Sequence, residues 1–219
     1  MAARRKKQEI GSVSSSRPKT LQRRKELLGV VYELISEHGI DAVTMRQIAQ
    51  AADISTGTIN YHFKNRHNLV ILALEAAYEL PEDWRSYEGS PLAQLQRLAS
   101  GYIFRSSRER FWLFWINYTA QSTRDDEMRR RQNDRYEKQR KFWKELLKAG
   151  IAAGEIDTAI DPEKTADDLL LTGHALVLRQ IQSPTPATRE LARALLADKF
   201  AEITRKGHGQ SGRRSALGR

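Results

Sequence analysis

Cysteine is absent from the 219-residue chain, and long apolar runs are absent too. Without cysteine the protein has neither disulfides nor thiol chemistry, which is compatible with a reducing compartment. No apolar stretch approaches the roughly 20 residues that a membrane span requires, so we expect no membrane partner. The basic N-terminus is not followed by an apolar segment, so we expect no signal peptide and a cytoplasmic protein.

Sequence signatures of catalysis are missing as well. The chain has no Walker loop, no G-x-S-x-G and no H-E-x-x-H motif. Residues 207–212 fit G-x-G-x-x-G, but we expect neither a strand before them nor a helix after them, so the match is attributed to chance. The five histidines show no metal-ligand spacing. We therefore expect no enzyme, no metal and no cofactor, and a small helical enzyme is the least favoured alternative.

Positive charge is concentrated at the two ends of the chain. The net charge is +10, although residues 27–204 contain more acidic than basic side chains. Basic ends attract polyanions such as DNA, because binding to phosphates releases counterions. Such ends also increase solubility, so charge alone leaves a nucleic-acid partner open.

Alternating strand patterns are also absent, and apolar residues recur at helical spacing from residue 20 onward. This predicts an all-α fold with an N-terminal three-helix helix-turn-helix domain and a C-terminal helical ligand-binding and dimerisation bundle. Helices are expected over about 20–38, 44–51, 55–63, 65–80, 91–107, 111–118, 124–149, 163–182 and 186–204. The expected domains are a flexible basic arm (1–19), a DNA-binding domain (20–66), a regulatory domain (67–206) and a disordered basic tail (207–219).

Residues 44–66 have the pattern of a helix-turn-helix. Thr44 and Gln47 match a capping box at the start of the first helix, and Ser55 is a suitable N-cap for the second. On that second helix Ile59 and Phe63 are four residues apart, so both side chains face the core. The opposite side is polar and carries no acid.

A helix whose outward side is short, polar and free of acids can enter the major groove, which is about 12 Å wide. Asn60 can pair with an adenine edge, while Thr58 and Tyr61 offer hydroxyl groups. The alternative is an ordinary helical hairpin with a polar surface. The predicted DNA-contacting residues are Thr44, Arg46, Ser55, Thr56, Gly57, Thr58, Asn60, Tyr61, His62, Lys64 and Arg66.

The stretch from Thr44 to Leu69 resembles the N-terminal domain of TetR-type regulators. The resemblance implies phosphate or base contacts by the residues that match the family's motif. These are Thr44, Thr56, Gly57, Thr58, Tyr61, His62 and Arg66. The sequence departs from the usual pattern at three positions: Asn60 stands where Tyr is common, His62 where an aromatic is usual, and Arg66 where Lys is usual. We interpret Asn60 as a change of specificity.

The C-terminal half is rich in aromatic side chains that could line a ligand pocket. Aromatic rings with polar tips can bind a small molecule, and a cation could lie on their faces. Ordinary core packing is the alternative, and His174 could equally be a core or interface residue. The predicted ligand-binding residues are Phe111, Trp112, Trp115, Tyr118, Trp143 and His174.

Three C-terminal segments, 111–115, 149–156 and 170–176, resemble the C-terminal domain of BetI-type regulators. The resemblance implies a homodimer joined by the last two helices, and it does not carry over choline as the ligand. The last two helices are also apolar on more than one side, which is typical of helices buried on both faces. An isologous four-helix contact would pair two recognition helices on a palindromic site.

These observations favour a homodimeric transcriptional regulator that binds a palindromic operator on double-stranded DNA and is released by a small-molecule effector. The alternative is a non-specific nucleic-acid-binding protein that acts through its basic tails. Repression is the favoured mode, and activation stays open.

Overall fold

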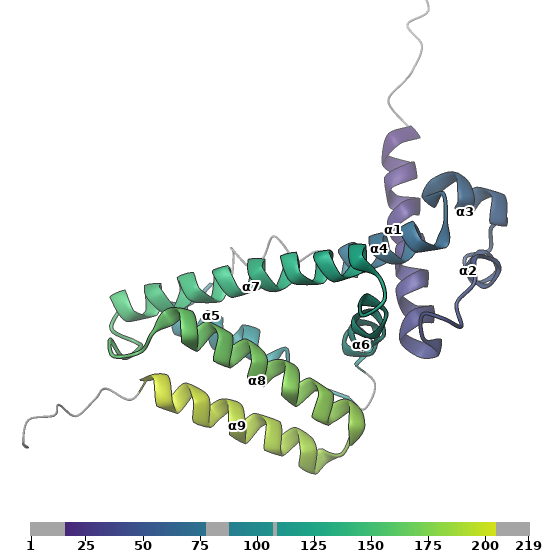
Figure 1. Ribbon diagram of the computed structural model, residues 1–219. Coiled ribbons are helices and arrows are strands. Elements are labelled where there is room, and N and C mark those ends of the chain that lie inside the picture. The colour runs from purple at the N-terminus through teal and green to yellow at the C-terminus, as the bar shows by residue number, and fades with distance from the viewer. Residues whose placement is uncertain (1–15, 78–87, 107–108, 205–219) are drawn as a thin grey trace, which may run out of the picture. The chain divides into compact units, whose positions relative to one another are not determined.

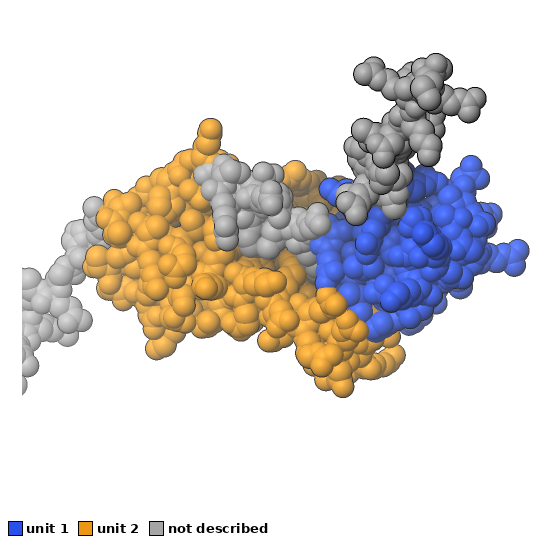
Figure 2. All heavy atoms as spheres, turned by 90° about the horizontal axis from the view of Figure 1, so that it is seen from above, with its two compact units in different colours: residues 1–79 blue, residues 80–219 orange. Residues whose placement is uncertain are grey.

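The computed structural model describes residues 16–77, 88–106 and 109–204, and within these ranges the regular secondary structure is helical (Figure 1). The all-α prediction is confirmed. The chain divides into two compact units, residues 1–79 and 80–219, which are coloured separately in Figure 2. Each unit has its own buried apolar core.

Unit 1 contains the first four helices. They are α1 (Ser16–His38), α2 (Met45–Ala51), α3 (Thr56–Phe63) and α4 (Arg66–Ala77). The first helix begins before its predicted start at residue 20. It ends as predicted before Gly39, whose φ of 82° lies in the left-handed region that glycine adopts without strain.

α4 belongs to this first unit because its apolar side packs against α1. Leu69, Ile71 and Leu74 of α4 are buried, as are Val31 and Ile35 of α1. The compact unit therefore extends beyond residue 66, where the sequence placed the end of the DNA-binding domain. The predicted end of this helix near residue 80 lies outside the described residues, as do the N-terminal arm up to residue 15 and the C-terminal tail.

Unit 2 contains the other five helices of the described residues. They are α5 (Pro91–Ser100), α6 (Arg110–Ser122), α7 (Asp126–Ala152), α8 (Pro162–Gln182) and α9 (Pro186–Thr204). α8 and α9 run side by side in opposite directions, and α8 also packs along α7 (Figure 1). The carboxylate of Asp161 accepts hydrogen bonds from the first backbone N–H groups of α8, which confirms the predicted N-cap before Pro162.

α5 ends at Ser100, so the prediction that this helix continues to about residue 107 was wrong. The chain turns there and buries Tyr102 and Phe104 in the core. The backbone of the turn is bound by Gln180 of α8, which is fully buried. The Phe104 N–H donates to Gln180 Oε1 at 2.8 Å, and Gln180 Nε2 donates to the Tyr102 carbonyl at 2.9 Å. A buried side-chain amide thus replaces the hydrogen bonds that a longer helix would have made.

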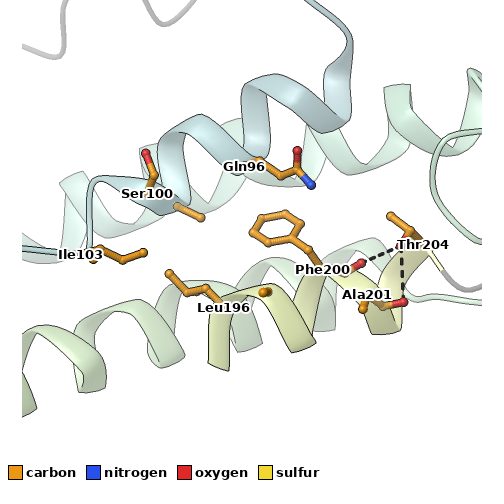
Figure 3. A pocket seen from close by; sticks show the side chains of 9 residues that line it. Gln96, Ser100, Ile103, Leu196, Phe200, Ala201 and Thr204 are labelled. Atoms are coloured by element: carbon orange, nitrogen blue, oxygen red, sulfur yellow. Dashed lines mark hydrogen bonds between the residues drawn. The ribbon is translucent and has the colours of Figure 1, made fainter. Parts of the chain in front are cut away.

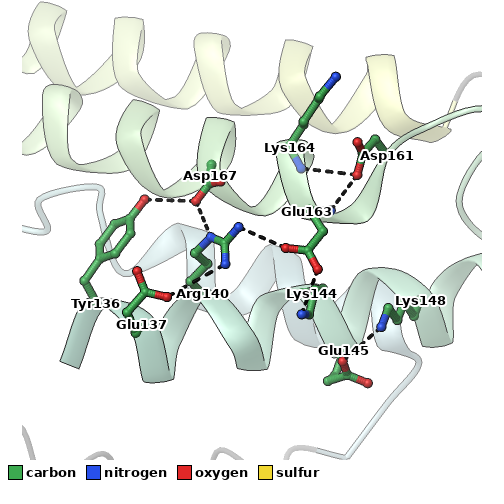
Figure 4. Close-up of polar contacts among 10 residues, drawn as sticks. All are labelled: Tyr136, Glu137, Arg140, Lys144, Glu145, Lys148, Asp161, Glu163, Lys164 and Asp167. Carbon is green, nitrogen blue, oxygen red and sulfur yellow. Dashed lines mark hydrogen bonds and ion pairs between the residues drawn. The ribbon is translucent and has the colours of Figure 1, made fainter. Parts of the chain in front are cut away.

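Ion pairs connect α7 to the first turns of α8 (Figure 4). Arg140 donates to Asp167 at 2.6 Å and to Glu163 at 2.9 Å, and Lys144 also donates to Glu163 at 2.9 Å. The hydroxyl of Tyr136 donates to Asp167 at 3.2 Å. The hydrogen bond and charge of Arg140 hold the pKa of the Asp167 carboxyl below its ordinary value of 3.8.

We expect Asp167→Asn to reduce the loss of thermal stability that occurs as the pH falls. The pKa of Asp167 is lowered in the folded state, so its contribution to the free energy of unfolding is present above the ordinary pKa and is lost as the pH falls through the folded value. The variant should melt no more than about 3 °C below the wild type at pH 7, because the pairs are partly exposed. The difference should shrink below pH 4.

The measurement is thermal unfolding by circular dichroism between pH 7 and pH 3. Asp134→Asn is the matched control, because Asp134 is an exposed acid on α7. Parallel melting curves for the wild type and Asp167→Asn across this range would contradict the assignment.

Candidate nucleic-acid interface and ligand site

The starts of α2 and α3 are fixed by two side-chain caps. The hydroxyl of Thr44 accepts from the Gln47 N–H at 3.2 Å, and Gln47 Oε1 accepts from the Thr44 N–H at 2.8 Å. At the start of α3, Ser55 Oγ accepts from the Thr58 N–H at 3.1 Å. Both predicted caps are confirmed. They set the direction in which each short helix leaves the turn.

The inner side of α3 is anchored in the core of unit 1. Ile59 and Phe63 are fully buried, together with Ile48 of α2. The basic N-terminal part of α1 supports the same region, since Arg23 Nη2 donates to the carbonyl of Ala52 at 3.1 Å. The predicted orientation of α3, with Ile59 and Phe63 inward, is confirmed.

The outer side of α3 faces solvent. Asn60 is exposed, and Tyr61 is 84% exposed, an unusual position for a tyrosine without a partner-binding role. Three predicted contact residues are half-buried, namely Thr58, His62 and Arg66. The exposed ones are Thr44, Arg46, Ser55, Thr56, Gly57, Asn60, Tyr61 and Lys64. The structure therefore gathers a polar, acid-free surface on one side of two short helices.

The guanidinium of Arg66, a predicted phosphate contact, binds two backbone carbonyls of unit 1. Its Nε donates to the carbonyl of Val43 at 2.6 Å, and its Nη2 donates to the carbonyl of Ile40. The guanidinium thus ties the start of α4 to the loop between α1 and α2. In the structure Arg66 holds the domain together, and its phosphate contact stays a prediction. The arginine in place of the family's usual lysine was the available signal, because a planar fork can reach two carbonyls at once.

In unit 2 the aromatic side chains gather around Tyr102, in the turn after α5. Its ring centroid lies 4.9 Å from that of Trp112, 6.0 Å from that of Trp143 and 5.3 Å from that of His174. Trp115 stacks on His174 with the centroids 5.1 Å apart. We refer to these five residues as the aromatic cluster. Four of them are among the six predicted ligand-binding residues.

The other two predicted ligand residues lie at the edge of this group or away from it. Phe111 is half-buried, with the guanidinium carbon of Arg135 5.9 Å from its ring centroid. Tyr118 is fully buried and stacks on Phe114 with the centroids 6.4 Å apart. Tyr102 was among the aromatic residues that the sequence offered for a pocket but not among the six predicted ligand-binding residues, and the neighbouring Gln139 was missed. A signal existed for Gln139, which lies one helical turn before Trp143.

Burial shifts the pKa values of the two titratable side chains in the aromatic cluster, Tyr102 and His174. Desolvation raises the pKa of the Tyr102 hydroxyl, which accepts a hydrogen bond from Gln139 Nε2 at 2.7 Å. Desolvation, together with the positive charge of Arg135, lowers the pKa of His174 to about 4. His174 is therefore neutral at pH 7.

A hollow of about 410 Å³ lies between α5 and α9 (Figure 3). Leu196 and Phe200 project into it from α9, and Gln96 and Ser100 line it from α5. None of the six predicted ligand-binding residues lines this hollow. Its position therefore gives no support to the predicted ligand site.

Neither a membrane-spanning helix nor a cluster of metal ligands occurs in the part of the chain that the structure describes. No helix within residues 16–77, 88–106 and 109–204 combines the length and apolarity needed to cross a membrane. The same residues contain no group of three or more acidic, histidine or cysteine side chains arranged to hold a metal ion.

Comparison with protein families assigns both units. Residues 27–73 match the family of bacterial regulatory proteins named after TetR, and residues 91–205, more than half of the chain, match the C-terminal domain of BetI-type transcriptional repressors. The chain belongs to the TetR family. It is a DNA-binding transcriptional repressor of a non-enzymatic family, and both resemblances read from the sequence are confirmed.

Individual members of the TetR family share only low sequence identity with this chain. The repressor KstR2 of Mycobacterium tuberculosis is 27% identical over 143 residues, which cover 64% of this chain and 72% of the relative. The class D tetracycline repressor of Escherichia coli is 36% identical over 73 residues, covering 29% and 34% of the two chains. A regulator from Saccharomonospora viridis, solved with choline, superposes with a TM-score of 0.72 at 21% identity and covers 84% of this chain and 96% of its own.

We expect Asn60→Ala to weaken specific DNA binding without affecting folding. Asn60 is exposed on α3, so its removal leaves the core intact. A bidentate contact from asparagine to adenine contributes about 1–3 kcal/mol of discrimination, so affinity for the specific site should fall about tenfold or more. Affinity for unrelated DNA should stay the same.

Gel-shift titration against the specific and a scrambled duplex measures both affinities. Asn133→Ala is the matched control, because Asn133 is exposed on α7 in unit 2. Unchanged specific binding by Asn60→Ala would remove Asn60 from the base-reading surface.

Proposed function

We propose that this TetR-family protein acts as a homodimer that binds a palindromic operator through two copies of α3 and leaves it when a small molecule binds unit 2. The observation that carries the proposal is the acid-free polar side of α3, with Asn60 and Tyr61 exposed above the buried Ile59 and Phe63. A helix held in this way can lie in the major groove with its polar side against the base edges.

The proposed contacts divide into base-reading and positioning residues. Asn60 and Tyr61 present hydrogen-bonding groups at the exposed centre of α3, where base edges would lie. Arg46 and Lys64 are exposed cations at the ends of the surface, suited to phosphates. The remaining proposed contacts, mostly hydroxyl-bearing residues, are Thr44, Ser55, Thr56, Gly57, Thr58, His62 and Arg66.

The proposed dimer interface is formed by α8 and α9. Leu171 and Leu178 of α8 are exposed, as are Leu191 and Leu195 of α9. Both helices also bury apolar residues on their inner sides, so each is apolar on two faces. An isologous contact between two copies would cover these leucines and hold two α3 helices at a fixed spacing.

The proposed effector site is the aromatic cluster around Tyr102, with Phe111 at its edge and Tyr118 farther away. The solved relative from Saccharomonospora viridis holds choline, which supports a small-molecule ligand for this type of domain. A ligand that binds better to one spacing of the recognition helices than to the other would shift the dimer away from the DNA-binding form. Because the target DNA lies in the cytoplasm, we propose that compartment for the protein.

Selection from random duplex DNA tests the proposed function. The full-length protein should enrich a palindrome whose half-sites are about one helical turn apart, because a two-fold symmetric dimer reads the same sequence twice. The competing hypothesis, non-specific binding through the basic tails, predicts no enriched sequence and equal affinity for every duplex. Recovery of unrelated sequences after several rounds would refute operator recognition.

A charged substitution in the proposed interface should separate the two copies. Leu178→Glu places a carboxylate where the dimer buries apolar surface, so the protein should elute as a monomer and lose at least about tenfold in operator affinity. Light scattering and gel shifts measure the two effects. Ala149→Glu introduces the same charge at an exposed position of α7 and should stay dimeric. A dimeric Leu178→Glu protein with full operator affinity would place the interface elsewhere.

A further inference from the structure

The hollow between α5 and α9 has no part in the proposed function (Figure 3). Its volume of about 410 Å³ lies within the roughly 300–1,000 Å³ that is typical of sites for small organic molecules. Its described lining includes none of the five residues of the aromatic cluster, so a molecule bound here would not occupy the proposed effector site. The hollow is therefore a separate candidate site in unit 2.

The large side chains that α9 contributes to the hollow are covered, and the small ones are exposed. Leu196 and Phe200 are 4% and 7% exposed, whereas Ala197 and Ala201 beside them are exposed. The exposed leucines of the proposed dimer interface lie outside the hollow. Protein partners anchor on large, accessible side chains at an interface. This pattern therefore favours a small molecule over a second protein surface as the occupant.

The lining carries no charge. Of the nine described residues that line the hollow, six are apolar and three are polar but uncharged. Moving a charged group into such surroundings costs free energy unless an opposite charge compensates it. The hollow therefore favours an uncharged ligand.

The three polar lining residues offer a ligand one free donor group, the amide of Gln96. The hydroxyl of Ser100 donates to the carbonyl of Arg97 at 2.6 Å. The hydroxyl of Thr204 donates to the carbonyl of Phe200 at 2.9 Å, so both hydroxyl hydrogens are used within their own helices. Gln96 is exposed, makes no hydrogen bond to another described residue and extends from α5 toward α9 (Figure 3). Its N–H groups can therefore bind an acceptor such as a carbonyl oxygen.

We propose that the hollow between α5 and α9 binds an uncharged, mainly aliphatic molecule whose carbonyl oxygen accepts a hydrogen bond from Gln96. The apolar body of the ligand packs against Ile103, Leu196 and Phe200. This site is a second small-molecule site, and it does not depend on the proposed role of the aromatic cluster. Its occupant would contact α9, the helix that also carries Leu195 of the proposed dimer interface.

Calorimetric titration of the full-length protein with two probes of the same size tests the charge. 4-Cyclohexylbutan-2-one and 3-cyclohexylpropanoate share a cyclohexylethyl body and a carbonyl group, and the ketone has a methyl group where the acid has a charged oxygen. The ketone should bind at millimolar concentration. The carboxylate should bind at least about tenfold more weakly, because no lining side chain compensates its charge.

Filling the hollow tests the location of the site. Ala201 lines the hollow and is exposed on α9, so the added side-chain atoms of Ala201→Leu should occupy ligand space without disturbing the helix. The variant should bind the ketone at least about tenfold more weakly. Ala149→Leu makes the same change at an exposed position of α7 outside the hollow and should bind the ketone like the wild type. Melting curves confirm that both variants are folded.

Gln96→Leu tests the hydrogen bond. The change removes the amide and keeps a side chain of similar size, so affinity for the ketone should fall about threefold to tenfold, the effect of one hydrogen bond. Gln50→Leu makes the same change at an exposed position of α2 in unit 1 and should leave the affinity unchanged.

Three results would overturn the inference: no binding of the ketone at millimolar concentration, equal or tighter binding of the carboxylate, or full affinity for the ketone in Ala201→Leu. The last result would place the bound ketone elsewhere in the protein. Selection of DNA with the same preparation separates this failure from failure of the proposed function. A protein that enriches a palindrome and binds no ketone keeps the proposed function and loses this site, and a protein that binds the ketone in the hollow and enriches no operator has the reverse outcome.

Discussion

The burial of Ile59 and Phe63 is the constraint on which DNA recognition depends. α3 has eight residues, too few to hold its position without support, and these two side chains attach it to a core shared with α1, α2 and α4. The cap at Ser55 then fixes where the helix starts, and the left-handed backbone at Lys64, with φ of 64°, turns the chain away where it ends. The exposed positions of Asn60 and Tyr61 follow from this anchoring.

In unit 2, α8 has the corresponding central position. Gly173 lies beneath Tyr102, where a Cβ atom would come within 2.7 Å of the ring, so helix and ring are in direct contact. The same helix carries the exposed Leu171 and Leu178. A ligand that displaces Tyr102 would therefore also shift α8, which we propose for the dimer interface. Closely packed elements transmit such small displacements.

The sequence predicted those features that arise from local patterns. The caps at Thr44 and Ser55, the inward side of α3 and the start of α8 at Pro162 all follow from residue types at fixed spacing. Features that depend on a distant partner were missed. The end of α5 depends on Gln180, 78 residues beyond Tyr102 in sequence, and the role of Arg66 depends on carbonyls in a loop more than twenty residues earlier. No local pattern contains such information.

The aromatic cluster shows why residue type alone cannot define a ligand. Tryptophan, tyrosine and phenylalanine in one helical domain fit a cation cage, a pocket for a neutral molecule and an ordinary core equally well. Charge and unpaired polar atoms separate these possibilities. His174 is neutral at pH 7, so it brings no positive charge of its own to the cluster. The unpaired atoms of Gln139 and Trp143 both lie on α7, one helical turn apart. Because an unpaired buried donor and an unpaired buried acceptor both cost free energy, their presence argues for a ligand that supplies a partner for each.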